Sequence, residues 1–325
     1  MTIPTRVLGR TGVEVSILGY GAMELRGSDA MGGPAISVEE AGRLLNELLD
    51  AGVNLIDTSI DYGRSEGLIG RWLGSRRDQF FLASKCGCPL DIEPGWGPSE
   101  VAAAHDFTPE NVRSGVEQSL RRLRTDHLDL VQVHMSPTRT QLESDGTIGA
   151  LEDLRAEGKV RFIGMSGTLP NLPDHIAMGV FDVFQVPYSA VQGEHEPFIT
   201  QAADAGAGIL VRGGAARGTA SEDKDWSVEP LTLAGPRAPA KDLWQAAGLD
   251  ELLPEGMGRH EFLLRYTLSH PGLSSAIVGT SKLPHFQSNA AIAARGPLAP
   301  ELYDEAKRRL AAGSGRAPTT LRSIR

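Results

Sequence analysis

Two short stretches decide the fold, FFLASK at residues 80–85 and LDLVQVH at residues 128–134. Each is a nearly continuous apolar run, as expected for a β-strand that helices cover on both faces. Each also ends on an ionisable side chain, Lys85 in the first stretch and His134 in the second. The pattern predicts buried parallel strands that carry polar groups at their carboxyl ends.

Similar runs recur along the chain, separated by longer helix-like segments. The predicted strands are residues 16–21, 54–59, 80–85, 128–134, 160–166, 183–188, 208–212 and 275–279. The intervening segments carry helix signals: Ser37 and Glu40 have capping-box spacing, and Thr108-Pro109 is typical of a helix start. Eight strand–helix units indicate a parallel α/β fold. Pattern alone allows either a closed (β/α)8 TIM barrel or an open doubly wound sheet.

The strand ends separate these two architectures. Polar residues stand at or just beyond the carboxyl ends of five successive strands, and they are Asp57, Lys85, His134, Ser166 and Gln185. In a barrel these ends converge on one mouth, where active sites are built. Along the edge of an open sheet they could not all meet. We therefore predict a single barrel domain over residues 1–325.

Several segments fall outside the regular alternation of strands and helices. Residues 3–15 predict a β-hairpin that turns near Gly9–Gly12, ahead of the first barrel strand. Long loops follow the third and seventh strands, at residues 87–107 and 215–258, and βα loops of this length usually contribute to function. Residues 313–325 are basic and are expected to form a flexible tail.

Composition excludes several classes of function. The formal net charge of −9 argues against a nucleic-acid or anionic-membrane partner. No apolar run approaches the roughly 18 residues of a membrane span. The N-terminus lacks the apolar stretch of a signal peptide, so we expect a cytoplasmic protein. Cys86 and Cys88 have no second cysteine pair to complete a zinc site, so we expect no metal.

Three motifs carry a resemblance to a known family. They are DTSIDYG at residues 57–63, SKC at 84–86 and LDLVQVH at 128–134, supported by LGRTG at 8–12, SLRRL at 119–123 and GKVRFIG at 158–164. In this order they resemble the aldo-keto reductase family, whose proton-transfer tetrad is Asp, Tyr, Lys and His. Carried over by position, the tetrad is Asp57, Tyr62, Lys85 and His134.

The resemblance implies an NAD(P)H-dependent oxidoreductase that reduces an aldehyde, ketone or sugar carbonyl, or runs the reverse oxidation. Tyr62 would be the proton donor. The ordinary tyrosine pKa of about 10 makes a poor acid at neutral pH, and we expect the Lys85 ammonium to lower the pKa of Tyr62. Asp57 would hold Lys85, and His134 would orient the carbonyl of a small-molecule substrate.

The resemblance also implies cofactor contacts. Ser166 and Gln185 match positions that bind the nicotinamide carboxamide, and Tyr188 is expected to stack on the nicotinamide ring. The remaining predicted contacts are Arg212, Gly213, Gly279, Thr280, Ser281, Lys282, His285, Gln287 and Asn289. No G-x-G-x-x-G fingerprint supports a Rossmann fold.

The sequence departs from the family pattern at three positions of the cofactor segment. Gly167 replaces an asparagine, Ser288 replaces a glutamate, and His285 stands where many members have an arginine for the 2′-phosphate. We expect NADPH, with NADH as the alternative, because Thr280, Ser281 and Lys282 could still bind the 2′-phosphate.

Two other functions stay open from the sequence. One is a binding module that senses the nicotinamide cofactor with little turnover, although a sensor need not keep a complete tetrad. The other is a cofactor-free barrel enzyme, such as an isomerase, with Lys85 as a Schiff-base lysine.

Overall fold

The computed structural model describes residues 2–28, 35–91, 97–215 and 240–314. Eight parallel strands close into a barrel in the order β10-β3-β4-β5-β6-β7-β8-β9. The barrel strands are β3 (Leu18–Gly21), β4 (Leu55–Asp57), β5 (Phe81–Cys86), β6 (Leu128–Val133), β7 (Val160–Ser166), β8 (Val183–Pro187), β9 (Gly208–Arg212) and β10 (Ser275–Val278). Each overlaps a predicted strand, so the predicted (β/α)8 barrel is confirmed and the open sheet is excluded.

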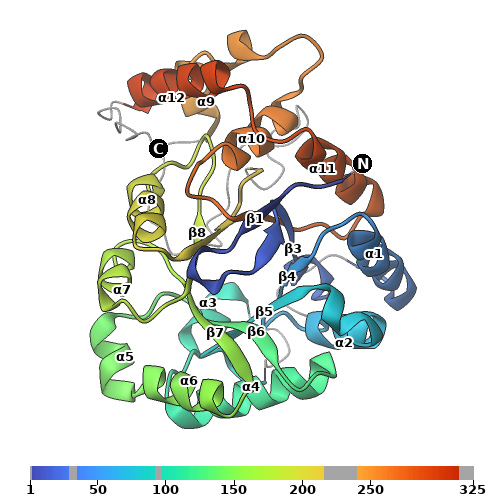
Figure 1. Ribbon diagram of the computed structural model, residues 1–325, viewed down its shortest axis with the longest axis vertical. Helices are drawn as coiled ribbons and strands as arrows, with labels where there is room; N and C mark the ends of the chain where they lie inside the picture. The colour runs from blue at the N-terminus through green and yellow to red at the C-terminus, as the bar shows by residue number, and fades with distance from the viewer. Residues whose placement is uncertain (1, 29–34, 92–96, 216–239, 315–325) are drawn as a thin grey trace.

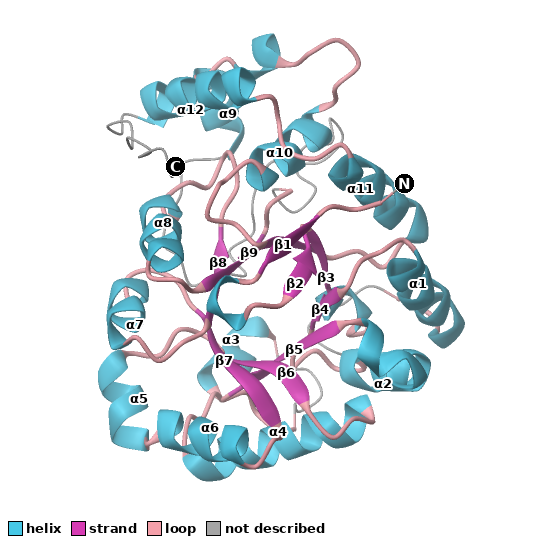
Figure 2. Cartoon of the chain, in the orientation of Figure 1, coloured by secondary structure: helices cyan, strands magenta, loops and turns pink. Residues whose placement is uncertain are grey.

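Helices surround the barrel (Figure 2). They are α1 (Val38–Asp50), α2 (Ser65–Leu73), α3 (Pro98–Ala103), α4 (Pro109–Leu123), α5 (Arg139–Asp145), α6 (Thr147–Ala156), α7 (Leu172–Met178), α8 (Glu196–Asp204), α9 (Ala240–Ala246), α10 (Arg259–Leu268), α11 (Leu283–Ala294) and α12 (Pro300–Ser314). The helix caps predicted from the sequence are present at the starts of α1 and α4. Ser37 and Glu40 form a capping box on α1, and the Thr108 hydroxyl accepts a hydrogen bond from the Asn111 N–H at the start of α4.

A β-hairpin covers one end of the barrel, as predicted (Figure 1). Its strands are β1 (Thr5–Val7) and β2 (Glu14–Ser16), paired antiparallel. Leu8 and Val15 of the hairpin pack against apolar side chains inside the barrel. The backbones approach so closely that a Cβ on Gly9 would lie 2.2 Å from the Gly208 nitrogen. This end is therefore closed, which leaves the opposite end, where the strands have their carboxyl termini, for a site.

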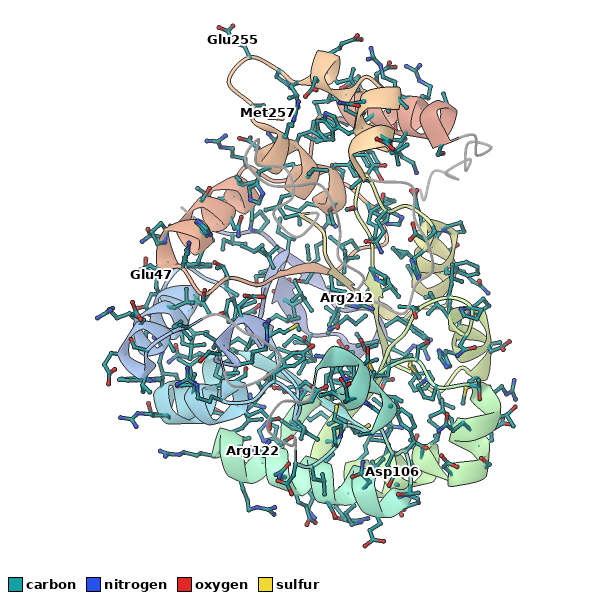
Figure 3. The ribbon with its side chains drawn as sticks, turned by 180° about the vertical axis from the view of Figure 1, so that it is seen from behind. Glu47, Asp106, Arg122, Arg212, Glu255 and Met257 are labelled. Carbon is teal, nitrogen blue, oxygen red and sulfur yellow. The ribbon has the colours of Figure 1, made fainter. Side chains whose placement is uncertain are left out.

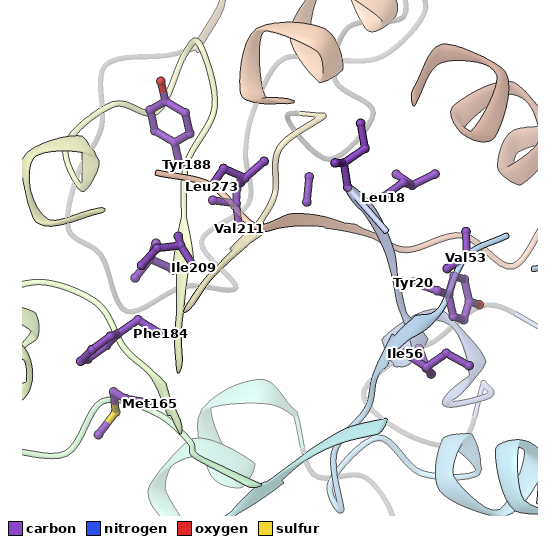
Figure 4. Packing of buried hydrophobic residues seen from close by; sticks show 14 of the residues in the cluster. Leu18, Tyr20, Val53, Ile56, Met165, Phe184, Tyr188, Ile209, Val211 and Leu273 are labelled. Carbon is purple, nitrogen blue, oxygen red and sulfur yellow. The ribbon is translucent and has the colours of Figure 1, made fainter. Parts of the chain in front are cut away.

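Side chains alternate between the barrel interior and the helix layer along each strand. The interior cluster includes Leu55, Phe81, Leu130, Val183, Leu210 and Ile277. The neighbouring residues Ile56, Phe184 and Val211 belong to the outer core between strands and helices (Figure 4). Because the alternation has a period of two, each inward residue predicts which later residues of its strand reach the mouth. Asp57, Lys85 and Gln185 have this inward parity.

The expected long loops follow β5 and β9. The first contains α3 and the second leads into α9, while residues 92–96 and 216–239 lie outside the described part of the chain. A flexible tail is expected from residue 313, but Gly313 and Ser314 still belong to α12. Residues 315–325 lie outside the described part. Among the described helices, none has the length and apolar character that crossing a membrane requires.

Candidate active site

A buried ion pair forms the floor of the barrel mouth. The Lys85 ammonium donates to Asp57 Oδ2 over 2.8 Å and to the Thr58 carbonyl over 2.7 Å. The side chains of Lys85 and Asp57 are 1% and 6% exposed. Burial works against a charged lysine, but the facing Asp57 and Tyr62 outweigh it, so the pKa of Lys85 is raised. The charged form of Lys85 is therefore favoured inside the barrel.

Two glutamine amides complete the shell around Asp57. Gln132 Nε2 and Gln185 Nε2 donate to Asp57 Oδ1 over 2.8 and 2.9 Å. Gln185 Oε1 in turn accepts a hydrogen bond from the Ser166 hydroxyl over 3.3 Å. The sequence prediction missed Gln132. Its signal was its place two residues before His134, which puts both side chains on the inward face of one strand.

Tyr62 lies in the loop after β4, directly over the ion pair. The Lys85 nitrogen is 4.9 Å from the centroid of the Tyr62 ring. Burial raises the pKa of Tyr62 to about 12, although the positive charges of Lys85 and Arg212 act to lower it. The expected lowering effect of Lys85 on the pKa of Tyr62 is therefore present, but burial outweighs it and the net shift is upward. The loss of hydration destabilises the phenolate by more than the nearby positive charges stabilise it.

His134 follows β6 and stands across the mouth from Tyr62. The two rings meet edge to face with centroids 6.3 Å apart. The carboxylate of Asp61 is 3.5 Å from His134 Nδ1. Burial opposes the charge of Asp61, but His134 outweighs it, and the pKa of Asp61 is lowered. The structure therefore brings all four tetrad residues together and adds Asp61, which the sequence prediction did not single out.

The structure does not bring Tyr188 to the mouth. Its side chain is fully buried and packs against His270 and Tyr266, with ring centroids 5.3 and 6.2 Å away. Tyr188 stands three residues after Gln185, so strand alternation turns it toward the helix layer (Figure 4). The expected stacking of Tyr188 on a nicotinamide ring therefore has no geometric support.

Arg212, at the end of β9, has the same inward parity as Leu210, which lies inside the barrel. Arg212 is half-buried, and its positive charge acts to lower the pKa of Tyr62. In Figure 3, which shows the side opposite to the hairpin, Arg212 lies over the middle of the barrel. Gly213 follows with φ of +74°, and a Cβ built there would meet no atom of the described residues within 4 Å.

The predicted adenosine segment runs from the end of β10 into α11. Gly279, Lys282 and His285 are exposed around the first turn of α11, whereas the Thr280 hydroxyl accepts a hydrogen bond from the Lys282 N–H. The last two predicted residues have protein partners. Asn289 Oδ1 lies 2.7 Å from His260 Nε2, and Gln287 Nε2 donates to Glu47 of α1 over 3.4 Å.

These groups fit a nicotinamide dinucleotide at both ends. The paired hydroxyl and amide of Ser166 and Gln185 can exchange hydrogen bonds with a carboxamide. Lys282, Ser281 and His285 lie at the N-terminus of a 12-residue helix, where the positive end of the helix dipole favours phosphate. The chemistry of the donors therefore suits the cofactor that the sequence resemblance implies.

The geometry defines this molecule as a closed (β/α)8 barrel protein with a buried Asp–Lys pair beneath a tyrosine. The family model described as "Aldo/keto reductase family" matches residues 17–309, and the chain belongs to that family. Aldo-keto reductases are oxidoreductases that reduce carbonyl groups with a nicotinamide cofactor.

Individual relatives resemble the chain to different extents. An aldo-keto reductase from Bacillus halodurans, solved in its holo form, is 28% identical with a TM-score of 0.78, covering 94% of this chain and 96% of its own. The oxidoreductase YqkF of Bacillus subtilis is 27% identical over 87% of this chain and 89% of its own. The NADH-specific methylglyoxal reductase of Escherichia coli is 29% identical over 56% of this chain and 58% of its own.

Proposed function

We propose that this protein is an NADPH-dependent reductase of a small aldehyde, ketone or sugar carbonyl, with Tyr62 as the proton donor. One observation carries the proposal: the buried Lys85–Asp57 pair lies directly beneath the Tyr62 ring, at the open end of the barrel. A positioned acid at a pocket mouth is what carbonyl reduction requires from the protein. The reverse oxidation would use the same groups with the proton moving the other way.

The cofactor supplies the hydride when it is bound, so the chain must orient it and manage the proton. Ser166 and Gln185 hold the carboxamide end, where Gln185 is itself fixed by its bond to Asp57. Lys282, Ser281 and His285 hold the phosphates beside α11. Arg212 and Gly213 lie between these two groups along the chain and border the mouth.

The proton comes from the Tyr62 hydroxyl, which donates to the carbonyl oxygen as that oxygen gains negative charge. A pKa near 12 keeps Tyr62 protonated at neutral pH, so the acid is present before each turnover. Its acidity must rise at the moment of transfer. The Lys85 ammonium stabilises the phenolate that forms, and Asp57 holds that ammonium in place.

His134 and Arg212 flank Tyr62 and act on the same oxygen. The edge-to-face contact with Tyr62 leaves the His134 ring at the mouth, where a ring N–H can donate to the carbonyl oxygen. The charge of Arg212 adds to the positive potential around the developing oxyanion. The substrate oxygen is therefore surrounded by donors and cations from three different segments of the barrel.

NADPH is proposed over NADH because Lys282 and His285 are both exposed where a 2′-phosphate would approach α11. Cofactor preference varies in the family, as the NADH-specific relative from Escherichia coli demonstrates by its name. A direct comparison of the two cofactors is therefore part of any assay.

The test is NADPH oxidation across a panel of small carbonyl compounds, with Tyr62→Phe and Tyr188→Phe compared to the parent protein. We expect Tyr62→Phe to lose about 100-fold or more in kcat with cofactor affinity retained, since a positioned acid contributes about 10²–10⁴-fold. Tyr188→Phe is the matched control and should retain turnover, because its ring lies in the helix layer. Undiminished turnover by Tyr62→Phe would refute the role of Tyr62. Cofactor binding without oxidation on the whole panel would favour a cofactor sensor.

A further inference from the structure

Four metal-ligating side chains converge beside the candidate active site, and the proposed reduction uses only one of them. Asp61, Cys88, His105 and His134 place one ligand atom each within 4.8 Å of all the others. They come from separate places in the fold: the loop after β4, the loop after β5, the residues after α3 and the end of β6. Three barrel units thus contribute to one cluster.

The spacing of the ligand atoms matches a tetrahedral ion. A zinc ion with Zn–N bonds of about 2.05 Å has neighbouring nitrogen ligands about 3.3 Å apart, and about 3.5 Å separates nitrogen from sulfur. His134 Nδ1 lies 3.4 Å from His105 Nε2, 3.3 Å from Cys88 Sγ and 3.5 Å from Asp61 Oδ2. His105 Nε2 is 3.9 Å from Asp61 Oδ2. These four ligand-atom distances lie between 3.3 and 3.9 Å, and every pair of ligand atoms in the cluster lies within 4.8 Å.

Hydrogen bonds alone do not account for this arrangement. A single ring nitrogen, His134 Nδ1, has three close polar neighbours, and an imidazole nitrogen makes one in-plane hydrogen bond. The carboxylate of Asp61 is 4% exposed, and its Oδ1 has no hydrogen-bond partner among the described residues. A buried carboxylate oxygen and two crowded nitrogens are the groups that a cation would satisfy.

His105 is oriented as a metal ligand. Its Nδ1 lies 2.8 Å from the Val101 carbonyl oxygen, which can only accept, so Nδ1 carries the proton. The lone pair of His105 is therefore on Nε2, the atom that faces the cluster. A ring N–H held by a backbone carbonyl is the usual support for a metal-bound histidine.

The ligand types indicate which ion the cluster would take. Thiolate, imidazole and carboxylate together suit zinc or a similar divalent transition metal, whereas magnesium and calcium prefer oxygen ligands. One carboxylate and one thiolate also balance the two charges of the ion, so the occupied site would be neutral where it is buried. We propose that Asp61, Cys88, His105 and His134 form a zinc-binding site in the mouth of the barrel.

Zinc binding would couple to the candidate active site through His134. The Cys88 thiol releases its proton to solvent on binding, because the thiolate is the ligand. A metal on His134 Nδ1 leaves the ring proton on Nε2, the tautomer that can donate to a carbonyl oxygen. The proposal revises the sequence expectation of no metal, which considered only cysteine pairs. Cys86 points into the outer core, and Cys88 finds its partners in other segments.

The test is a cobalt(II) and zinc(II) titration of the full chain after dialysis against a chelator. We expect one equivalent of cobalt to give the absorption of a tetrahedral ion with a thiolate-to-metal charge-transfer band, and zinc to displace it. Cys88→Ser should abolish the charge-transfer band and weaken zinc binding by more than about 100-fold, since loss of even a supporting partner costs about 10–100-fold. Cys86→Ser, the matched buried control, should keep both.

His105→Gln provides a second variant in case Cys88→Ser does not fold, and circular dichroism checks the fold of each. We expect His105→Gln to weaken zinc binding and to change the cobalt spectrum while retaining the thiolate band. Absence of a tetrahedral cobalt spectrum in the parent protein would overturn the proposal. So would zinc binding that survives both Cys88→Ser and His105→Gln, or binding that is lost in Cys86→Ser.

Discussion

Removing Lys85 tests the two roles of the buried ion pair, which are to stabilise the fold and to support proton transfer from Tyr62. In Lys85→Met the Asp57 carboxylate keeps its bonds from Gln132 and Gln185 but loses the Lys85 ammonium. Leaving one member of a buried pair uncompensated costs about 3–5 kcal/mol in the free energy of unfolding. We also expect kcat to fall by about 100-fold or more, because the Tyr62 phenolate then lacks the Lys85 ammonium that stabilises it.

The double variant Asp57→Asn/Lys85→Met distinguishes stability from chemistry. Both glutamine amides donate to the same oxygen of Asp57, Oδ1, so an asparagine oxygen in that place can accept both bonds. With both charges gone, most of the lost stability should return, since an apolar replacement of a buried ion pair is often neutral. Activity should stay absent, because the double variant still lacks the ammonium.

The assay is urea unfolding of the parent, the single and the double variant, with turnover measured on the same preparations. The reasoning predicts a destabilised inactive single variant and a stable inactive double variant. Near-normal turnover by Lys85→Met would refute the role of the ammonium. A double variant as unstable as the single variant would refute the electrostatic account of the pair.

Three further outcomes follow from the described contacts. His285→Arg should raise the preference for NADPH in a comparison of kcat/KM for the two cofactors; no change would place the 2′-phosphate elsewhere. Gln132→Met should lower the free energy of unfolding by about 1.5–3 kcal/mol, the worth of a hydrogen bond to a charged group, in urea titrations. Burial lowers the pKa of His270 to about 3, whereas an unfolded histidine has a pKa of about 6.5. As pH falls between these two values, the unfolded state binds a proton that the native state does not, so the free energy of unfolding should fall by about 1.4 kcal/mol per pH unit. His270→Asn should flatten this acid dependence.

The strands and the strand-end positions of Asp57, Lys85 and His134 were predictable from local signals, whereas Tyr62 was assigned from the family resemblance. Apolar runs such as residues 80–85 are buried on both sides wherever they lie in an α/β fold, and the polar residue at each end marks the mouth. Parallel strands bring their carboxyl ends to one place, so Asp57, Lys85 and His134 meet without knowledge of any loop. Counted along each strand, the same alternation adds Gln132 to the inward residues and turns Tyr188 toward the helix layer.

Other features depend on packing that the sequence does not reveal. The direction of the Tyr62 pKa shift follows from how far its ring is buried, and sequence reasoning considered only the charge of Lys85. His105 reaches His134 across 29 residues of chain through a loop whose path no local pattern sets. Asp61 lies inside a recognised motif, but its orientation toward His134 emerges only when the loop after β4 is folded.

The most direct test of the central claim is a fluorescence titration of the purified protein with NADPH and, separately, with NADH. It requires no knowledge of the carbonyl substrate. The account predicts saturable binding of a nicotinamide cofactor, tighter for NADPH, and unchanged by Tyr188→Phe. Binding of neither cofactor would contradict a nicotinamide-dependent reductase at this barrel mouth.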